Sequence, residues 1–75
     1  MADISAEEWI AAFAAEAGVA APDEQQIARL LKLAAVAAHS SERIAAPIVC
    51  WIAGSSGIDA ERAIEIAEGL AERGG

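Results

Sequence analysis

Residues 37–54 read AAHSSERIAAPIVCWIAG, and this stretch decides how the rest of the chain is interpreted. Its second half, PIVCWIA at 47–53, would present apolar side chains all around a helix, which indicates an element enclosed by others. The β-branched pair IV also suits a buried strand, but no other segment of the sequence offers a strand to pair with. Pro47 fits the first turn of a helix, where its missing N–H costs nothing. We therefore predict a central apolar helix over about 47–53.

Start and stop signals predict three further helices. Each begins at a polar capping residue: Ser5, Asp23 and Asp59. Ser5 is followed three residues later by Glu8, which makes a capping box, and Gly18 ends this first helix. The second helix is predicted to run to about His39, and the GSSG sequence at 54–57 is predicted to be a loop before the fourth.

The spacing of apolar residues predicts which side of each helix is buried. In the first helix the apolar face comprises Trp9, Ile10, Phe13, Ala14 and Ala17. In the second helix the predicted buried stripe comprises Ile27, Leu30, Leu31, Ala34, Ala37 and Ala38, with Gln25, Arg29 and Lys32 on the opposite side. In the fourth helix the inner face comprises Ala60, Ala63, Ile64, Ala67 and Leu70, and the outer face Glu61, Glu65, Glu68 and Glu72.

Length and composition then define the expected architecture. The 75 residues suffice for one small domain, and alanine supplies half of the apolar residues. We predict an all-α fold over 1–75: a compact bundle of four principal helices that encloses the helix at 47–53, with frayed ends at 1–4 and 73–75. An alanine-rich core buries little area per residue, so a partner or a second copy is a reasonable source of added stability.

The charge distribution argues against several classes of partner. The net charge is −7, and residues 1–26 hold six acids and no base. An acidic chain without a basic stripe is a poor match for nucleic acid or for an anionic membrane surface. The N-terminus lacks the basic start and apolar run of a signal peptide, and no apolar stretch reaches the roughly 18 residues of a membrane span. We expect a cytoplasmic protein.

One cluster of polar residues could form a catalytic or binding site. It lies near the bend and comprises His39, Glu42 and Arg43. One reading makes His39 a general base oriented by Glu42, with Arg43 holding an anion. The favoured reading is a structural clamp, in which these three residues fasten the bend and Pro47 starts the core helix. Cys50 lies between Val49 and Trp51 and is expected to be a buried small hydrophobe. The ligand spacing of a metal site is absent from the sequence, so no metal is expected.

Apolar residues outside the main stripes offer a different kind of site. These are Val36, Ile44, Ile48 and Ile66. If they face solvent, they form a patch for a partner or a second copy. If the four helices use more than one face to enclose the apolar helix, the same residues belong to the core. The sequence leaves both readings open.

The central stretch also resembles a motif of a small bacterial domain of unknown function, roughly Ala-His-x-x-Glu-Arg-x-Ala-Ala-Pro, an apolar run and Gly. The matching positions are Ala38, His39, Glu42, Arg43, Ala45, Ala46, Pro47 and Gly54. Trp9 in EEWI and the Ala/Glu-rich last helix look similar too, whereas Ser40 stands where Gly is usual and Ile44 where Pro is common. In that family the domain occurs alone or at the C-terminus of molybdenum-cofactor guanylyltransferases. The resemblance implies an accessory role and carries no catalytic residue.

Three functions follow as expectations. The first is a non-catalytic accessory module, not an enzyme and without a cofactor, that binds a protein such as the molybdenum-cofactor guanylyltransferase. The second is a module that holds an anionic pterin or nucleotide with Arg29, His39 and Arg43. The third is a structural protein that associates with itself as a homodimer.

Overall fold

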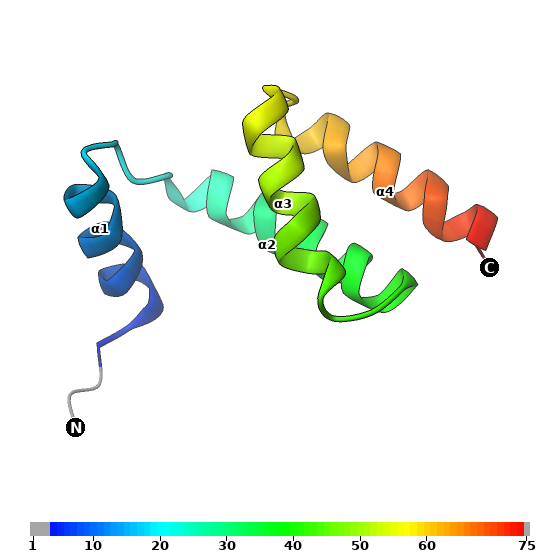
Figure 1. Ribbon diagram of the computed structural model, residues 1–75, viewed down its shortest axis with the longest axis horizontal. Helices are drawn as coiled ribbons and strands as arrows, with labels where there is room; N and C mark the ends of the chain where they lie inside the picture. Colours follow the sequence, from blue (N-terminus) through cyan, green and yellow to red (C-terminus); the bar gives the residue numbers. More distant parts are fainter. Residues whose placement is uncertain (1–3, 75) are drawn as a thin grey trace.

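The computed structural model describes residues 4–74, and these fold into four α-helices with no strand among them (Figure 1). The helices are α1 (Ala6–Ala17), α2 (Glu24–Ser40), α3 (Ala45–Ser56) and α4 (Ala60–Gly74). The all-α prediction with four principal helices is therefore confirmed. Of the ends predicted to fray, residues 1–3 and 75 lie outside the described part, and α4 continues through Gly74.

The predicted caps of the helices are formed. The Ser5 hydroxyl accepts from the Glu8 N–H at 3.0 Å, and the Glu8 carboxylate accepts from the Ser5 N–H at 3.1 Å. Gly18 ends α1 with a left-handed φ of 77°. Asp23 and Asp59 precede α2 and α4. The carboxylate of each accepts a hydrogen bond of 2.8 Å from the backbone N–H three residues later. These signals are local, so each helix start follows from a few neighbouring residues.

The predicted loop at 54–57 is wrong for most of its length. Helix α3 extends through Ser56, and the chain turns at Gly57, which has a φ of 80°. The hydroxyls of Ser55 and Ser56 each donate to a carbonyl one turn earlier in α3. This bonding satisfies the serines within the helix, so they do not compete with its backbone ladder.

The core lies where α3 and α4 pack against α2. Leu33 of α2 is 0% exposed, and three alanines surround it: Ala53, Ala63 and Ala67. The predicted stripe of α2 omitted Leu33 and included Leu31, which is 66% exposed. Small alanine side chains let the two outer helices approach α2 closely around this one leucine.

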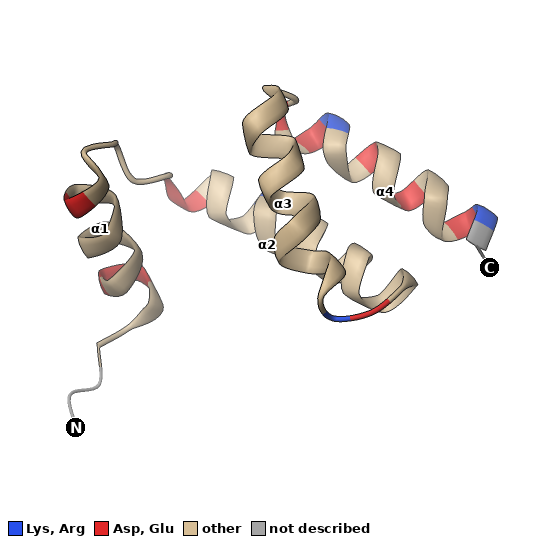
Figure 2. Ribbon diagram, in the orientation of Figure 1, with Lys and Arg blue, Asp and Glu red and all other residues tan. Residues whose placement is uncertain are grey.

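The side of α2 predicted to face solvent is in fact the side that meets α4. Arg29 pairs with Glu61, and Lys32 pairs with Glu68, both at 3.6 Å. Since the paired positions advance together, α2 and α4 run in the same general direction, as Figure 1 shows. Two glutamates of the acidic stripe of α4, red in Figure 2, thus form ion pairs with basic side chains of α2. These pairs are exposed and contribute little stability, but they match the two faces in charge.

Helix α3 is less enclosed than predicted. Ala53 is buried against α2, whereas Trp51 is 71% exposed. The reason is the position of α1, which lies to one side of the other three helices and does not cover α3 (Figure 1). The Cα radius of gyration is 13.6 Å, against about 11 Å for a typical compact domain of this length. One end of the molecule therefore extends away from the core.

Candidate functional site

The most prominent exposed feature is a row of large apolar side chains along α3, which we call the outer stripe: Ile44, Ile48 and Trp51. All three are more than half exposed. Their spacing of four and three residues places them on one face of the helix. Ala53, about half a turn around α3 from this row, is buried against α2. The outer stripe thus points away from the core.

A second feature is an apolar groove of about 340 Å³ between α3 and α4, which we call the α3–α4 groove. Small residues lie along it at Ala37, Ala53, Ala63 and Ala67. Larger side chains that line it are Val49, Ile52, Ile66 and Leu70. Ser40 and Ser41 add hydroxyl groups at one end, and none of the described residues that line the groove is charged. It is therefore suited to an apolar side chain.

Ile44, Ile48 and Ile66, which the sequence left open between patch and core, are thus exposed, while Val36 packs partly buried against the core. Trp51, Ile52 and Leu70 are also exposed. Sequence reasoning missed Trp51 because an apolar residue in an apolar run was assumed to be enclosed. The signal that identifies it is its spacing from Ile44 and Ile48.

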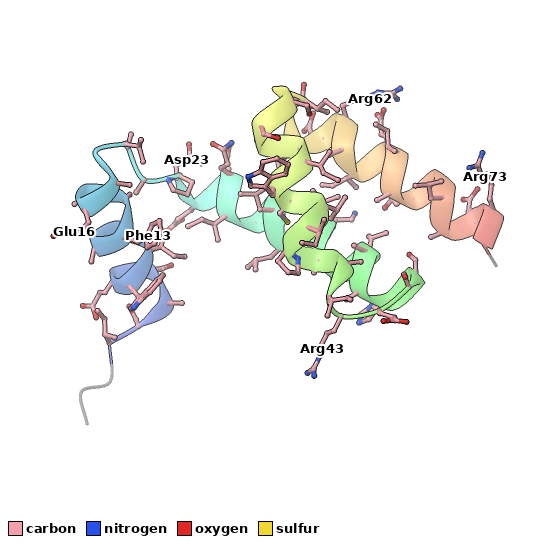
Figure 3. The ribbon with its side chains drawn as sticks, in the orientation of Figure 1. Phe13, Glu16, Asp23, Arg43, Arg62 and Arg73 are labelled. Carbon is pink, nitrogen blue, oxygen red and sulfur yellow. The ribbon has the colours of Figure 1, made fainter. Side chains whose placement is uncertain are left out.

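The polar cluster at the bend is arranged differently from a clamp. His39 lies in the last turn of α2, and Glu42 and Arg43 lie in the bend; all three are exposed. No hydrogen bond or ion pair joins these three described side chains. Figure 3 shows the Arg43 side chain extending away from the helices.

Backbone groups hold the bend instead. The Ala45 N–H donates to the Glu42 carbonyl at 2.9 Å, and the Ala46 N–H donates to the Arg43 carbonyl at 3.1 Å. Pro47 follows as the third residue of α3, within the first turn, where a missing donor costs nothing. The bend therefore needs no side-chain partner.

The replacement Arg43→Ala is accordingly expected to change the melting temperature very little. An exposed side chain without a partner contributes within about 0.5 kcal/mol. A thermal melt followed by circular dichroism checks this, with the conservative Arg43→Lys as the comparison. A fall of more than about 5 °C for the alanine variant would restore the clamp interpretation.

The three residues considered for an anionic ligand are spread over the molecule. Arg29 pairs with Glu61 near the start of α4. His39 lies ten residues further along α2, about 15 Å away along the axis. Arg43 extends into solvent beyond the end of that helix. These positions provide no shared pocket, and the α3–α4 groove contains none of the three.

Cys50 lies on the side of α3 that faces α2. Its Sγ is 3.9 Å from the Leu30 carbonyl oxygen, a long and weak contact. Burial raises the pKa of the Cys50 thiol, so the thiol form is favoured at neutral pH. The side chain acts as a small packing group beside Val49 and Val36.

The described residues form neither a cluster of metal ligands nor a membrane span. Within residues 4–74, His, Cys, Asp and Glu side chains do not gather in groups of three or more that are able to hold a metal ion. In that same part of the chain, every helix is too short or too polar to cross a bilayer.

Of the comparisons with known proteins, only the one with protein-family models gave a match. Neither the curated proteins nor the solved structures contain a match. A family model described as "Domain of unknown function (DUF6457)" matches residues 2–74. The resemblance to a small domain of unknown function is thereby confirmed. Because the match covers nearly the whole sequence, this chain belongs to the DUF6457 family.

Proposed function

We propose that this domain is a non-catalytic protein-interaction module, and that its outer stripe is the contact surface. The observation that carries the proposal is the exposure of Trp51 on the same helix face as the exposed Ile44 and Ile48. Trp51 is 71% exposed on a helix face, and its large apolar surface is hydrated unfavourably. Burial of that surface in an interface would contribute favourably to the free energy of binding. Interfaces depend on a few such anchors, among which tryptophan is enriched.

The surroundings of the outer stripe suit a protein partner. Ser55 continues the same face toward the end of α3, and Glu42 and Arg43 provide charge at its beginning. An apolar centre with a polar rim is the usual organisation of a protein interface. Since Ile48 and Trp51 lie on α3 and Ile44 is its N-cap, a partner groove or a second helix fits the stripe without rearrangement of the core.

We further propose that the partner is a molybdenum-cofactor guanylyltransferase in the cytoplasm. The support is the resemblance of the central motif to the domain that occurs at the C-terminus of those enzymes. The motif and the outer stripe overlap in sequence: His39 to Arg43 precede the stripe, Ala45 to Pro47 lie between Ile44 and Ile48, and Gly54 follows Trp51.

The proposal is tested by titrating the isotope-labelled domain with the guanylyltransferase of its own organism. We expect saturable amide shifts along α3 centred on Trp51. The replacement Trp51→Ala is expected to raise the dissociation constant at least about tenfold, since an anchor residue contributes about 2 kcal/mol or more.

Trp9→Ala is the matched control, because it removes the second tryptophan, which is also exposed but lies on α1. It is expected to leave enzyme binding unchanged. Absence of shifts at saturating enzyme would refute the guanylyltransferase as partner. Equal effects of the two tryptophan variants would refute the outer stripe as the surface.

A further inference from the structure

Helix α1 carries an apolar face that the other described residues of its own chain leave exposed. Trp9 and Phe13 stack on one another with ring centroids 5.5 Å apart, and they are 55% and 62% exposed. Of the described residues in α1, Ala14 alone is buried. A capped, amphipathic helix of 12 residues is therefore presented to solvent with its aromatic pair outward.

The α3–α4 groove is the complementary feature. Its α4 wall from Ala63 to Leu70 extends about 10 Å, whereas Trp9 and Phe13 are about 6 Å apart along the axis of α1. Small side chains along the groove leave room for large rings, and Ile52 and Ile66 provide apolar walls. The dimensions suit insertion of the aromatic pair.

In this structure α1 does not occupy the groove of its own chain. Neither Trp9 nor Phe13 lines the α3–α4 groove. Helix α1 lies to one side of the other three helices, and α3 lies between α1 and α4 (Figure 1). The groove of a second copy can receive the aromatic pair without a change in the fold of either chain.

The area available is sufficient for a dimer. A buried Trp or Phe hides about 150–250 Å², and more than half of each ring pair is exposed here. If two copies exchange α1 reciprocally, solvent-accessible surface is buried on both helices and in both grooves. The aromatic contacts alone account for about 900 Å² of this buried surface. Ile4 and Val19, exposed at the two ends of α1, bring the total to about 1,000 Å², the lower limit for a specific interface.

Charge makes a smaller contribution. Helix α1 carries three acids and no base: Glu7, Glu8 and Glu16. Glu42 and Arg43 are adjacent in the bend beside the lining residues Ser41 and Ala45, are exposed, and carry no net charge together. Because no charged side chain among the described residues lines the groove, apolar burial provides the attraction.

We propose that two copies of this chain form a dimer by exchanging α1, each placing Trp9 and Phe13 in the α3–α4 groove of the other. The exchange is a symmetric contact in which each copy gives and receives one helix. It uses a different surface from the outer stripe, so the two proposals stand or fall separately.

The test is analytical ultracentrifugation of the full chain over a range of concentrations. We expect a monomer–dimer equilibrium. Phe13→Asp on α1 and Ile66→Asp in the groove are each expected to raise the dimer dissociation constant at least about tenfold, because each places a charge in the apolar contact. Ile48→Asp is the matched control, since it makes the same change on the outer stripe and is expected to leave the dimer intact.

A mixing experiment identifies which copy supplies the helix. One sample is the double variant Ala15→Cys, Cys50→Ala, which has no isotope label and carries a nitroxide at residue 15. It is mixed with an isotope-labelled chain that carries no nitroxide. Line broadening at Ile66 and Ala67 of the labelled chain is expected only from contact between copies. A monomer at all concentrations, no broadening at Ile66 and Ala67 of the isotope-labelled chain, or equal effects of Ile66→Asp and Ile48→Asp would overturn the proposal.

Discussion

Replacing Leu33 with alanine is expected to lower the free energy of unfolding by roughly 2–5 kcal/mol. Leu33 is the one large side chain fully buried among the described residues, and its neighbours are alanines that fill a new cavity poorly. A domain of this size typically has about 4–11 kcal/mol in total. The variant should therefore melt more than about 10 °C lower or fail to fold.

Leu31→Ala is the control for this prediction. It makes the same chemical change two residues away on α2, at a side chain that is 66% exposed, and is expected to cost less than about 0.5 kcal/mol. Urea and thermal unfolding of the two variants, followed by tryptophan fluorescence and circular dichroism, measure the difference. A larger loss at Leu31 would mean that the stripe predicted from the sequence was the correct one and that α2 is rotated about its axis.

The glycines form a second series, in which alanine is expected to change stability in opposite directions. Gly54 and Gly69 are exposed within α3 and α4, and an added methyl group meets nothing within 4 Å. Alanine there is expected to raise the free energy of unfolding by about 0.5–1 kcal/mol, since it reduces the freedom of the unfolded chain. At Gly18 and Gly57 the space is equally open, but φ is +77° and +80°.

At these two turn positions alanine is expected to lower the free energy of unfolding by about 1–2 kcal/mol, because an L side chain is strained in the left-handed region. Gly57→Ala and Gly54→Ala, three residues apart, should thus differ by about 2 kcal/mol in chemical denaturation. Equal shifts for this pair would show that α3 ends before Gly54, as the sequence had suggested.

The parts of the fold that the sequence predicted well are those set by neighbouring residues. The caps at Ser5, Asp23 and Asp59 each depend on a side chain and a backbone N–H three residues apart. The number of helices and the stop at Gly18 follow in the same way. Such contacts form within one turn and do not depend on where the other helices lie.

The errors concern faces, which depend on the other helices. Helix α2 receives α3 on one side and α4 on the other, so a single stripe could not describe its burial, and Leu33 was missed. Trp51 was placed in the interior because a fully apolar helix is usually enclosed, but α1 lies elsewhere. The exposure of Ile44 and Ile48 was one of two readings, and only tertiary packing decided between them.

The alanine-rich core has a consequence for how this protein responds to temperature. Four of its five buried residues are alanines: Ala14, Ala53, Ala63 and Ala67. Little apolar surface is therefore newly hydrated when the chain unfolds, which keeps the heat capacity of unfolding low. A low heat capacity flattens the stability curve, so the folded fraction varies gradually on cooling as well as on warming. For such a domain we expect a low maximum of stability and a free energy of unfolding that changes slowly with temperature around that maximum.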